Sequence, residues 1–235
     1  MNLDVALCPA ELAGVDLTGR AAVVIDVLRA TTTVTAALES GAAAVIPHAT
    51  LDECRGHARR EPGVLLGGER GGIKPADFDL GNSPGEYTPE KVGGKRIAFS
   101  TTNGTRALLA CRGAESVLLG CLNNRAATAE RLADLEADTL LVCSAKQGRP
   151  NLEDTLCAGL LVERLRELVV GMQVTDRARL SLELAHALPP TPDNLARSDH
   201  GRLMLELGLR SDIQRCAELD VRSTVGRWTG GEIII

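Results

Sequence analysis

The segment from Val23 to Val34 limits the possible folds of this chain more than any other. It begins with an apolar, β-branched run that is typical of a strand buried on both faces. Asp26, Arg29 and three threonines follow before helical character resumes at residues 36–39. In an open α/β sheet, ligands bind at the carboxyl ends of strands, and the next helix N-terminus offers unpaired N–H groups to an anion. We therefore expect part of a site for a metal and a phosphate-like group here.

Short apolar runs alternate with helical patterns along most of the chain. We expect strands at residues 22–28, 43–47, 64–66, 96–100, 117–121 and 139–143, and helices at 31–40, 50–60, 106–112, 124–135 and 152–170. This alternation favours a largely parallel sheet with helices on its faces. The predicted fold class is therefore α/β, layered α/β/α with a largely parallel or mixed sheet, followed by a helical C-terminal region.

The two halves of the chain show weak internal similarity. At an offset of 72 residues the strand–turn–helix pattern recurs, and Val45 falls on Val117. This repeat predicts two related lobes, residues 1–93 with a long Gly- and Pro-rich loop at 67–93, and residues 94–235. Their threonine-rich turns would face each other across one cleft. The alternative is one continuous domain, because any two strand–helix units resemble each other.

Composition and charge favour a small ligand over a macromolecule. The net charge of −5 and the lack of a Lys/Arg-rich block argue against a nucleic-acid surface. One Trp, one Tyr and two Phe leave few surfaces on which bases could stack. No apolar run approaches the ~18 residues that span a bilayer, and the N-terminus lacks signal-peptide character. Seven cysteines without a CxxC pair are typical of free thiols in a reducing compartment, so we expect a cytoplasmic protein.

Polar residues gather in five clusters, each at the end of a predicted strand or in the long loop. The clusters lie at residues 26–33, 67–74, 77–84, 100–106 and 143–154. Each has a simpler explanation when taken alone, as a salt bridge, a turn or a helix cap. Because the carboxyl ends of parallel strands meet at one edge of a sheet, we expect the clusters to lie together and to form a site.

Several common catalytic motifs are missing. There is no GxxxxGK[ST] phosphate loop, no strand-borne GxGxxG, and no second Asp two residues after Asp26 as in haloacid-dehalogenase-type phosphatases. The four histidines lack the paired spacing of a zinc site, and we expect His200 on the surface. Cys143 and Arg149 have the Cys-x5-Arg spacing of a thiolate phosphatase, but nothing nearby lowers the thiol pKa.

Five motifs follow one another in a fixed order. They are Asp26-Val-Leu-Arg-Ala-Thr-Thr-Thr, Gly68-Glu-Arg-Gly-Gly-Ile-Lys, Phe78-Asp-Leu-Gly-Asn-Ser-Pro, Thr101-Thr-Asn-Gly-Thr and Leu152-Glu-Asp-Thr-Leu-Cys-Ala-Gly, with a weaker echo at His200-Gly-Arg-Leu and Asp212-Ile. Together they resemble the 2-phosphosulfolactate phosphatase family. The resemblance implies a Mg²⁺-dependent phosphatase that converts (2R)-2-O-phospho-3-sulfolactate to 3-sulfolactate and phosphate, a step of coenzyme M biosynthesis.

The residues and the resemblance together suggest roles for individual side chains. Oxygen ligands without His suit Mg²⁺, with Asp26, Glu69 and Asp154 as the candidate ligands. The candidate catalytic residues are Asp26, Arg29, Glu69 and Arg70. The candidate substrate-binding residues, which supply positive charge or hydrogen-bond donors to an anion, are Thr31, Thr32, Lys74, Thr101, Thr102, Asn103, Thr105, Arg106 and Lys146. The expected reaction is metal-assisted hydrolysis.

Three other functions fit parts of the sequence. They are a phosphatase of another small 2-phospho-acid, a non-catalytic protein that binds a small anion, and a transferase that uses the same cleft. A surplus of carboxylates argues against the binding protein, since uncompensated acids repel an anionic ligand. The last stretch, residues 223–235, is expected to form an edge strand or to pack on a neighbouring subunit, which favours a homodimer.

Overall fold

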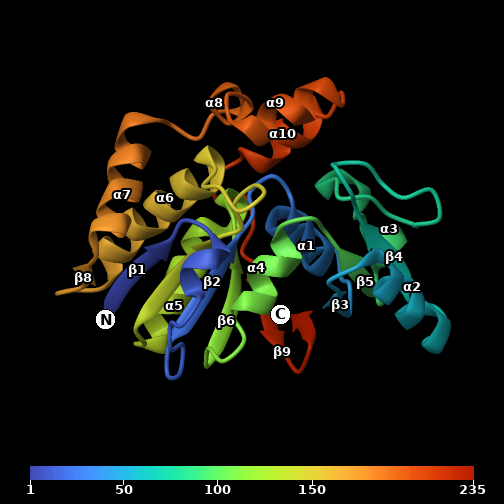
Figure 1. Ribbon diagram of the computed structural model, residues 1–235, viewed down its shortest axis with the longest axis horizontal. Coiled ribbons are helices and arrows are strands. Elements are labelled where there is room, and N and C mark those ends of the chain that lie inside the picture. Colours follow the sequence, from blue (N-terminus) through green and yellow to red (C-terminus); the bar gives the residue numbers. More distant parts are fainter.

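A mixed ten-stranded sheet runs through the whole computed structural model, which describes residues 1–235 (Figure 1). The strands are β1 (Asn2–Ala6), β2 (Ala21–Ile25), β3 (Ala44–Pro47), β4 (Leu65–Gly68), β5 (Arg96–Ser100), β6 (Ser116–Gly120), β7 (Thr139–Cys143), β8 (Gln173–Val174), β9 (Arg227–Thr229) and β10 (Glu232–Ile234). The helices are α1 (Ala30–Glu39), α2 (Leu51–Arg60), α3 (Pro89–Val92), α4 (Gly104–Ala110), α5 (Arg125–Leu135), α6 (Leu152–Leu168), α7 (Asp176–Ala187), α8 (Pro192–Ala196), α9 (Asp199–Glu206) and α10 (Arg210–Cys216). The predicted α/β class, with a mostly parallel but mixed sheet, is confirmed.

Two groups of parallel strands make up most of the sheet. The strand order is β4-β5-β3-β10-β9-β6-β2-β7-β1-β8. The chain crosses from the larger group to the smaller through β2–α1–β3 and returns through β5–α4–β6. The sheet is therefore continuous across the boundary proposed at residue 93, and β5 pairs with β3 and β4. The division into two lobes stays a prediction.

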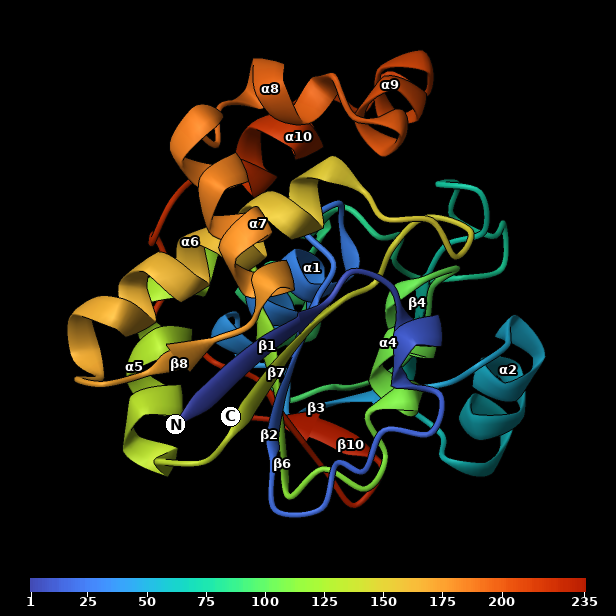
Figure 2. The ribbon, with the colours of Figure 1, turned by 60° about the vertical axis from the view of Figure 1, so that its left-hand side comes forward.

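The C-terminal residues join these two groups. β9 and β10 form an antiparallel hairpin in which β9 pairs with β6 and β10 with β3 (Figure 2). The expectation of an edge strand or of a tail on a second subunit was therefore wrong. Ile233 is only 2% exposed, so β10 buries its central residue within the chain's own sheet. The reason given for a homodimer no longer holds.

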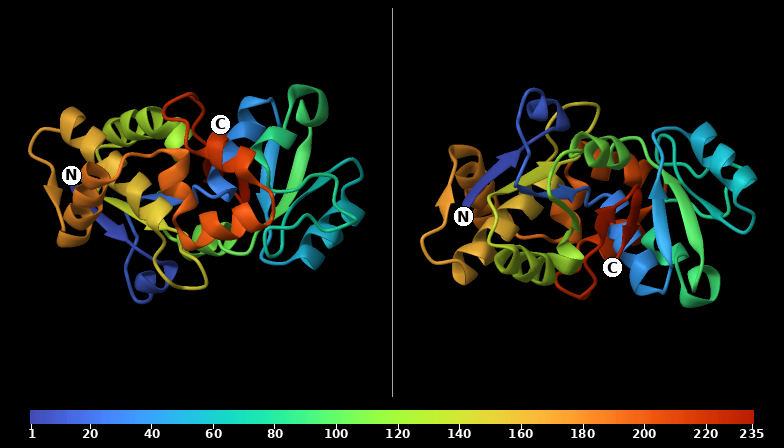
Figure 3. Two further views of the ribbon diagram at one scale, coloured as in Figure 1. Left: turned by 90° about the horizontal axis from the view of Figure 1, so that it is seen from above. Right: turned by 90° about the horizontal axis from the view of Figure 1, so that it is seen from below.

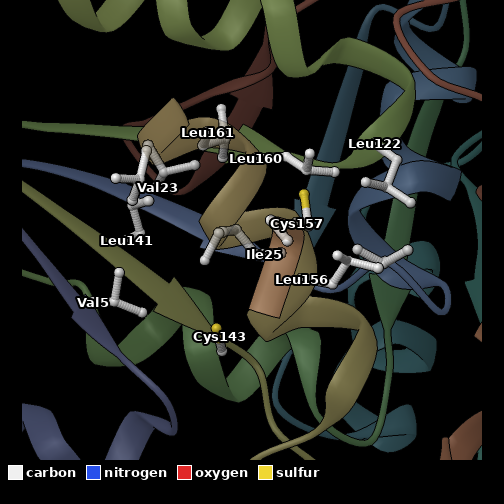
Figure 4. Close-up of a cluster of buried hydrophobic side chains, with 14 of the residues drawn as sticks. Val5, Val23, Ile25, Leu122, Leu141, Cys143, Leu156, Cys157, Leu160 and Leu161 are labelled. Carbon is white, nitrogen blue, oxygen red and sulfur yellow. The ribbon is translucent and has the colours of Figure 1, made fainter. Parts of the chain in front are cut away.

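Alternate residues of β2 face two separate cores. Val23 and Ile25 belong to a cluster that includes side chains of α5, α6 and α7 (Figure 4). Ala22 and Val24 belong to a second cluster with side chains of α1 and α4. Helices therefore cover both faces of the central strands, which agrees with the layered arrangement expected from an apolar run. Two strands were not predicted from the sequence: the five-residue β1 and the two-residue edge strand β8.

The helices after α7 lie across the carboxyl ends of the strands. We call α8 to α10, residues 192–216, the cap. Viewed from above, the cap covers the middle of the sheet (Figure 3). Its contacts with the rest of the chain include α10 packed against the short 3₁₀ turn Pro84–Glu86 of the long loop. The predicted helical C-terminal region is present, and no helix of the protein is long and apolar enough to cross a membrane.

Truncating Ile233 tests whether the hairpin is part of the folded core. Ile233→Ala should lower the free energy of unfolding by about 2–5 kcal/mol, because it leaves a cavity in the core cluster that also contains Val24 and Leu38. Ile235→Ala is the matched control, since Ile235 is 72% exposed and should change stability by less than ~0.5 kcal/mol. Urea unfolding of the two variants measures the difference. Equal losses of unfolding free energy in Ile233→Ala and Ile235→Ala would contradict the internal position of β10.

Candidate active site

A polar residue directly follows each of four strands. After β2, β4, β5 and β7 the chain continues with Asp26, Glu69, Thr101 and Ser144, each at most 6% exposed. Two of these strands belong to the smaller group and two to the larger, so the site draws on both parts of the sheet. The strands are parallel within each group, but three antiparallel pairings lie between the groups, so the two groups run in opposite directions through the sheet. The polar clusters of the two groups nevertheless meet: Arg29, after β2, donates to Gly72 O, after β4, at 2.9 Å.

Asp154 and Asp26 form the centre of the site. Asp154 lies in the first turn of α6 and is fully buried. Its Oδ1 accepts a hydrogen bond from Val27 N at 2.8 Å, and its Oδ2 accepts from Ser144 Oγ at 2.8 Å and Asn151 Nδ2 at 2.9 Å. Asp26 Oδ1 accepts from Ala30 N, at the start of α1, at 3.2 Å. The two carboxyl groups are therefore fixed by the turns that follow their strands.

Neither carboxyl group has a cationic partner. Burial and the charge of Asp154 raise the pKa of Asp26 to about 7, and the charge of Glu69 acts in the same direction. Burial and the charge of Glu153 raise the pKa of Asp154 to about 7. A carboxylate that is desolvated and faces another acid favours a proton or a bound cation. The centre of the site is thus suited to a positive ion.

Glu69 joins two loops at the same place. Its Oε2 accepts a hydrogen bond from Gly72 N at 2.6 Å, and its Oε1 accepts from Thr102 N at 2.7 Å. The long loop is therefore attached to the turn between β5 and α4. In that turn, a Cβ added to Gly104 would lie 2.7 Å from Asp26 Oδ2, so only glycine allows α4 to approach the carboxyl group this closely.

Arg29 connects three distant parts of the chain. Its Nη1 donates to Asp212 Oδ2 of the cap at 2.6 Å and to Ser83 Oγ at 3.2 Å, and its Nη2 donates to Gly72 O at 2.9 Å. The ion pair is buried on both sides. Arg29 forms its ion pair with Asp212 and not with Asp26. The simpler explanation of the Asp26–Arg29 spacing, a salt bridge between the two, is therefore wrong. Its Nε is buried without a partner and so remains a free donor.

The predicted threonines lie near the strand ends, as expected, but their hydroxyl groups mostly form hydrogen bonds with backbone atoms. Thr31 Oγ1 donates to Gly120 O at 2.8 Å, and Thr32 Oγ1 donates to Val27 O at 2.9 Å. Thr101 and Thr105 contact each other across the turn before α4. Thr31, Thr101 and Thr105 also line one small, largely apolar cavity of about 20 Å³ between α1 and α4. The two threonine-rich turns therefore face each other.

The catalytic candidate Arg70 and the other predicted substrate-binding residues differ in position. Arg70 is held by Ser100 Oγ at 2.8 Å and by Glu69 O at 2.7 Å, and Lys146 Nζ donates to Asp199 O of the cap at 2.7 Å. Lys74 and Arg106 are exposed, and neither contacts the buried carboxyl groups. Asn103 precedes α4 but makes no side-chain cap. The roles of these residues in binding stay predictions.

His200 is a site residue that the sequence did not identify. Its side chain is 17% exposed, and its Nδ1 lies 3.7 Å from Oε1 of the fully buried Glu153. Burial, assisted by the positive charges of Lys146 and Arg29, lowers the pKa of His200 to about 4. The expectation of a surface histidine was therefore wrong. The weak motifs at His200 and Asp212 were the only sequence signals for these cap residues.

Cys143 is not a nucleophile in this fold. It is completely buried at the end of β7, and burial raises the pKa of its thiol well above the usual value. A catalytic cysteine needs the opposite shift, since the thiolate is the reactive form. The next residue, Ser144, occupies the position that contacts Asp154. The thiolate alternative is therefore excluded.

Comparison with known proteins shows the family of this chain. The family model of 2-phosphosulpholactate phosphatase matches residues 7–231. A probable 2-phosphosulfolactate phosphatase of Carboxydothermus hydrogenoformans is 39% identical, covering 100% of this chain and 97% of the relative. Proteins with the same name from Thermotoga petrophila (41% identical, 92% of each chain) and Gloeobacter violaceus (42% identical, 91% and 90%) are also similar. This chain therefore belongs to the 2-phosphosulpholactate phosphatase family.

Proposed function

We propose that the protein hydrolyses 2-phospho-3-sulfolactate to 3-sulfolactate and phosphate with the help of Mg²⁺. The observation that carries the proposal is the pair of buried carboxyl groups, Asp26 and Asp154, which lie together at the strand ends without a cationic partner. Arg29 and the threonine-rich turns lie at the same edge. Family members of similar length carry the name of this activity.

The chemistry of the donor set fits a hard cation. The acidic groups of the centre offer oxygen atoms as metal ligands. Two further buried oxygen atoms beside Asp154 accept no hydrogen bond, namely Glu153 Oε2 and Asn151 Oδ1. No three Asp, Glu, His or Cys side chains form a complete ligand set. Mg²⁺ commonly binds one or two carboxylates and completes its shell with water and substrate oxygens. Asp26 and Asp154 are therefore the proposed ligands, and Glu69, whose two oxygens accept hydrogen bonds from Gly72 N and Thr102 N, stays a prediction as the third.

Each residue then has a role that follows from its surroundings. When bound, Mg²⁺ would offset charge on the transferring phosphoryl group and supply an acidified water. Arg29 can donate a hydrogen bond from its free Nε to an anion while its Nη1 stays bound to Asp212 of the cap. The cap and the long loop cover the carboxyl groups and exclude bulk water, which strengthens electrostatic interactions at the site.

Further expectations accompany this proposal. The product would enter coenzyme M biosynthesis, and the protein would act in the cytoplasm on a small anionic substrate, with no nucleic-acid partner. A homodimer also stays a prediction, now without support from the C-terminal residues. A phosphatase of another 2-phospho-acid and a non-catalytic anion-binding protein are the alternatives to be separated by experiment.

Phosphate release distinguishes these functions. We expect turnover of 2-phospho-3-sulfolactate in Mg²⁺ that exceeds turnover of 2-phospholactate and 2-phosphoglycerate, and that stops in excess EDTA. Preference for another member of the panel would reassign the substrate, and binding without turnover would favour the anion-binding protein. Transfer of phosphate to an added acceptor, in place of release into water, would indicate a transferase.

Replacing Asp26 tests the centre of the site. Asp26→Asn should lower kcat by more than ~10²-fold, a loss typical of removing one preorganised charge from an active site. The fold should persist, because the change removes repulsion between two buried acids. Asp193→Asn is the matched control, since Asp193 is 94% exposed on the cap. Phosphate release and circular dichroism measure the two effects, and retained activity in Asp26→Asn would rule out its catalytic role.

The raised pKa values predict how metal binding depends on pH. Asp26 and Asp154 have an ordinary pKa of 3.8 and a pKa of about 7 in the folded protein. Between these values the folded state binds more protons than the unfolded state, so the metal-free protein should lose stability as pH rises through this range. Mg²⁺ favours the ionised carboxylates, so the increase in Tm that it produces should be larger at pH 8 than at pH 5. An increase that does not vary with pH, or that is unchanged in Asp154→Asn, would contradict this prediction.

A further inference from the structure

A basic groove lies beside the buried carboxyl groups. It runs between the loop after β7 and the helices α8 and α9 of the cap, with a volume of about 620 Å³. This is within the usual size range of small-ligand sites. The groove has only two hydrophobic residues in its lining. Its chemistry therefore suits a polar or charged molecule.

The free charge of the groove is positive. Four basic residues line it, namely Lys146, Arg149, Arg197 and Arg202, together with the acidic residues Asp199 and Glu206. Arg202 pairs with Asp199. Arg149 and Arg197 form no ion pair, and both are exposed. The groove thus offers free guanidinium groups in a protein whose net charge is −5.

The floor of the groove is directly connected to the catalytic centre. Asn151 lines the groove and donates to Asp154 Oδ2 at 2.9 Å and to Glu153 Oε1 at 3.1 Å. Lys146 lines it as well, and its charge acts on both Glu153 and His200. A molecule in the groove could therefore contact Asn151, which in turn contacts Asp154, on the side of the site that faces the cap.

The charges at the two ends of the proposed substrate favour one orientation of the substrate in the site. A sulfonate is ionised at all physiological pH values and has three acceptor oxygens. Mg²⁺ would hold the phosphate at the buried acids, whereas a sulfonate without its own cation would be repelled by them. The planar guanidinium group can form paired hydrogen bonds to such an anion. With the phosphate beside Asp26, the sulfonate gains most by pointing into the basic groove.

We propose that this groove is the sulfonate subsite and that Arg149 and Arg197 set the preference for a sulfonated substrate. The proposal depends on the phosphatase function proposed above and adds to it the residues that choose the substrate. Both arginines lie outside the buried centre, so they act on selection and binding of the substrate and not on the transfer of phosphate.

The test compares two substrates that differ in the sulfonate. The kcat/KM for 2-phospho-3-sulfolactate is divided by that for 2-phospholactate, in the full-length protein with Mg²⁺. In Arg149→Gln/Arg197→Gln this ratio should fall by about 10- to 100-fold, as expected for lost hydrogen bonds to a charged group. Most of the loss should be in KM of the sulfonated substrate. Glu206→Gln should raise the ratio, because it removes the unpaired acid of the groove.

The control is Arg59→Gln, which removes an exposed arginine from α2 and should leave the ratio unchanged. An unchanged ratio in the double variant would overturn the groove proposal while leaving the phosphatase function intact. Equal losses on both substrates would also overturn it, since a general field or a damaged fold acts on both. A wild-type protein inactive on both substrates would overturn the phosphatase function and this assignment with it.

Discussion

The burial of two acidic side chains beside each other is the constraint on which this site depends. Removing a carboxylate from water is costly unless it is hydrogen-bonded and its charge is balanced. The protein meets the first need at Asp154 with donors from Val27, Ser144 and Asn151. It does not meet the second, because no Lys or Arg pairs with Asp154 or with Asp26. The fold thus maintains an unneutralised negative centre under a cover of helices, an arrangement that suits a bound cation and an anionic substrate.

Arg29 shows how the cover is attached. It is the basic residue nearest to Asp26 in the sequence, yet it is bound to Asp212, Ser83 and the backbone of Gly72. A buried ion pair adds little to stability, but breaking it leaves an uncompensated charge, so it strongly fixes the arrangement of its partners. Through this one guanidinium group, the long loop and the cap are both held against the end of β2. The cover and the site are consequently one structure.

The path of the chain explains why residues from both halves meet. Each of the two crossings between strand groups places threonines near the strand ends, in the first turn of α1 and around the start of α4. Ligands of open α/β sheets bind where such connections diverge. The hairpin of β9 and β10 fills the gap that the crossings leave in the sheet. The C-terminal residues, which the sequence connected to no function, thus complete the platform beneath the site.

Local patterns predicted the elements of this protein well. The apolar run before Asp26 indicated a buried strand, and the polar residues after strands were predicted to gather in one site. Asp26, Glu69 and Thr101 do lie together, but the two strand groups run in opposite directions, so the packing of the whole sheet and not a shared strand direction brings them together. The five motifs identified the family. These features are encoded within a few residues of one another, so no knowledge of distant contacts is needed to find them.

Tertiary structure decided what depends on long-range packing. His200 and Asp212 lie beside Glu153 and Arg29 because the cap folds back over the strand ends, and no local pattern encodes that path of the chain. The same is true of β10, whose few apolar residues resemble an edge strand until β3 and β9 enclose them. The sequence by itself determined which strands and motifs exist and what chemistry they carry. Only the packed structure decided which carboxyl groups are left without a counter-charge, because burial and the distance between charges are properties of the whole fold.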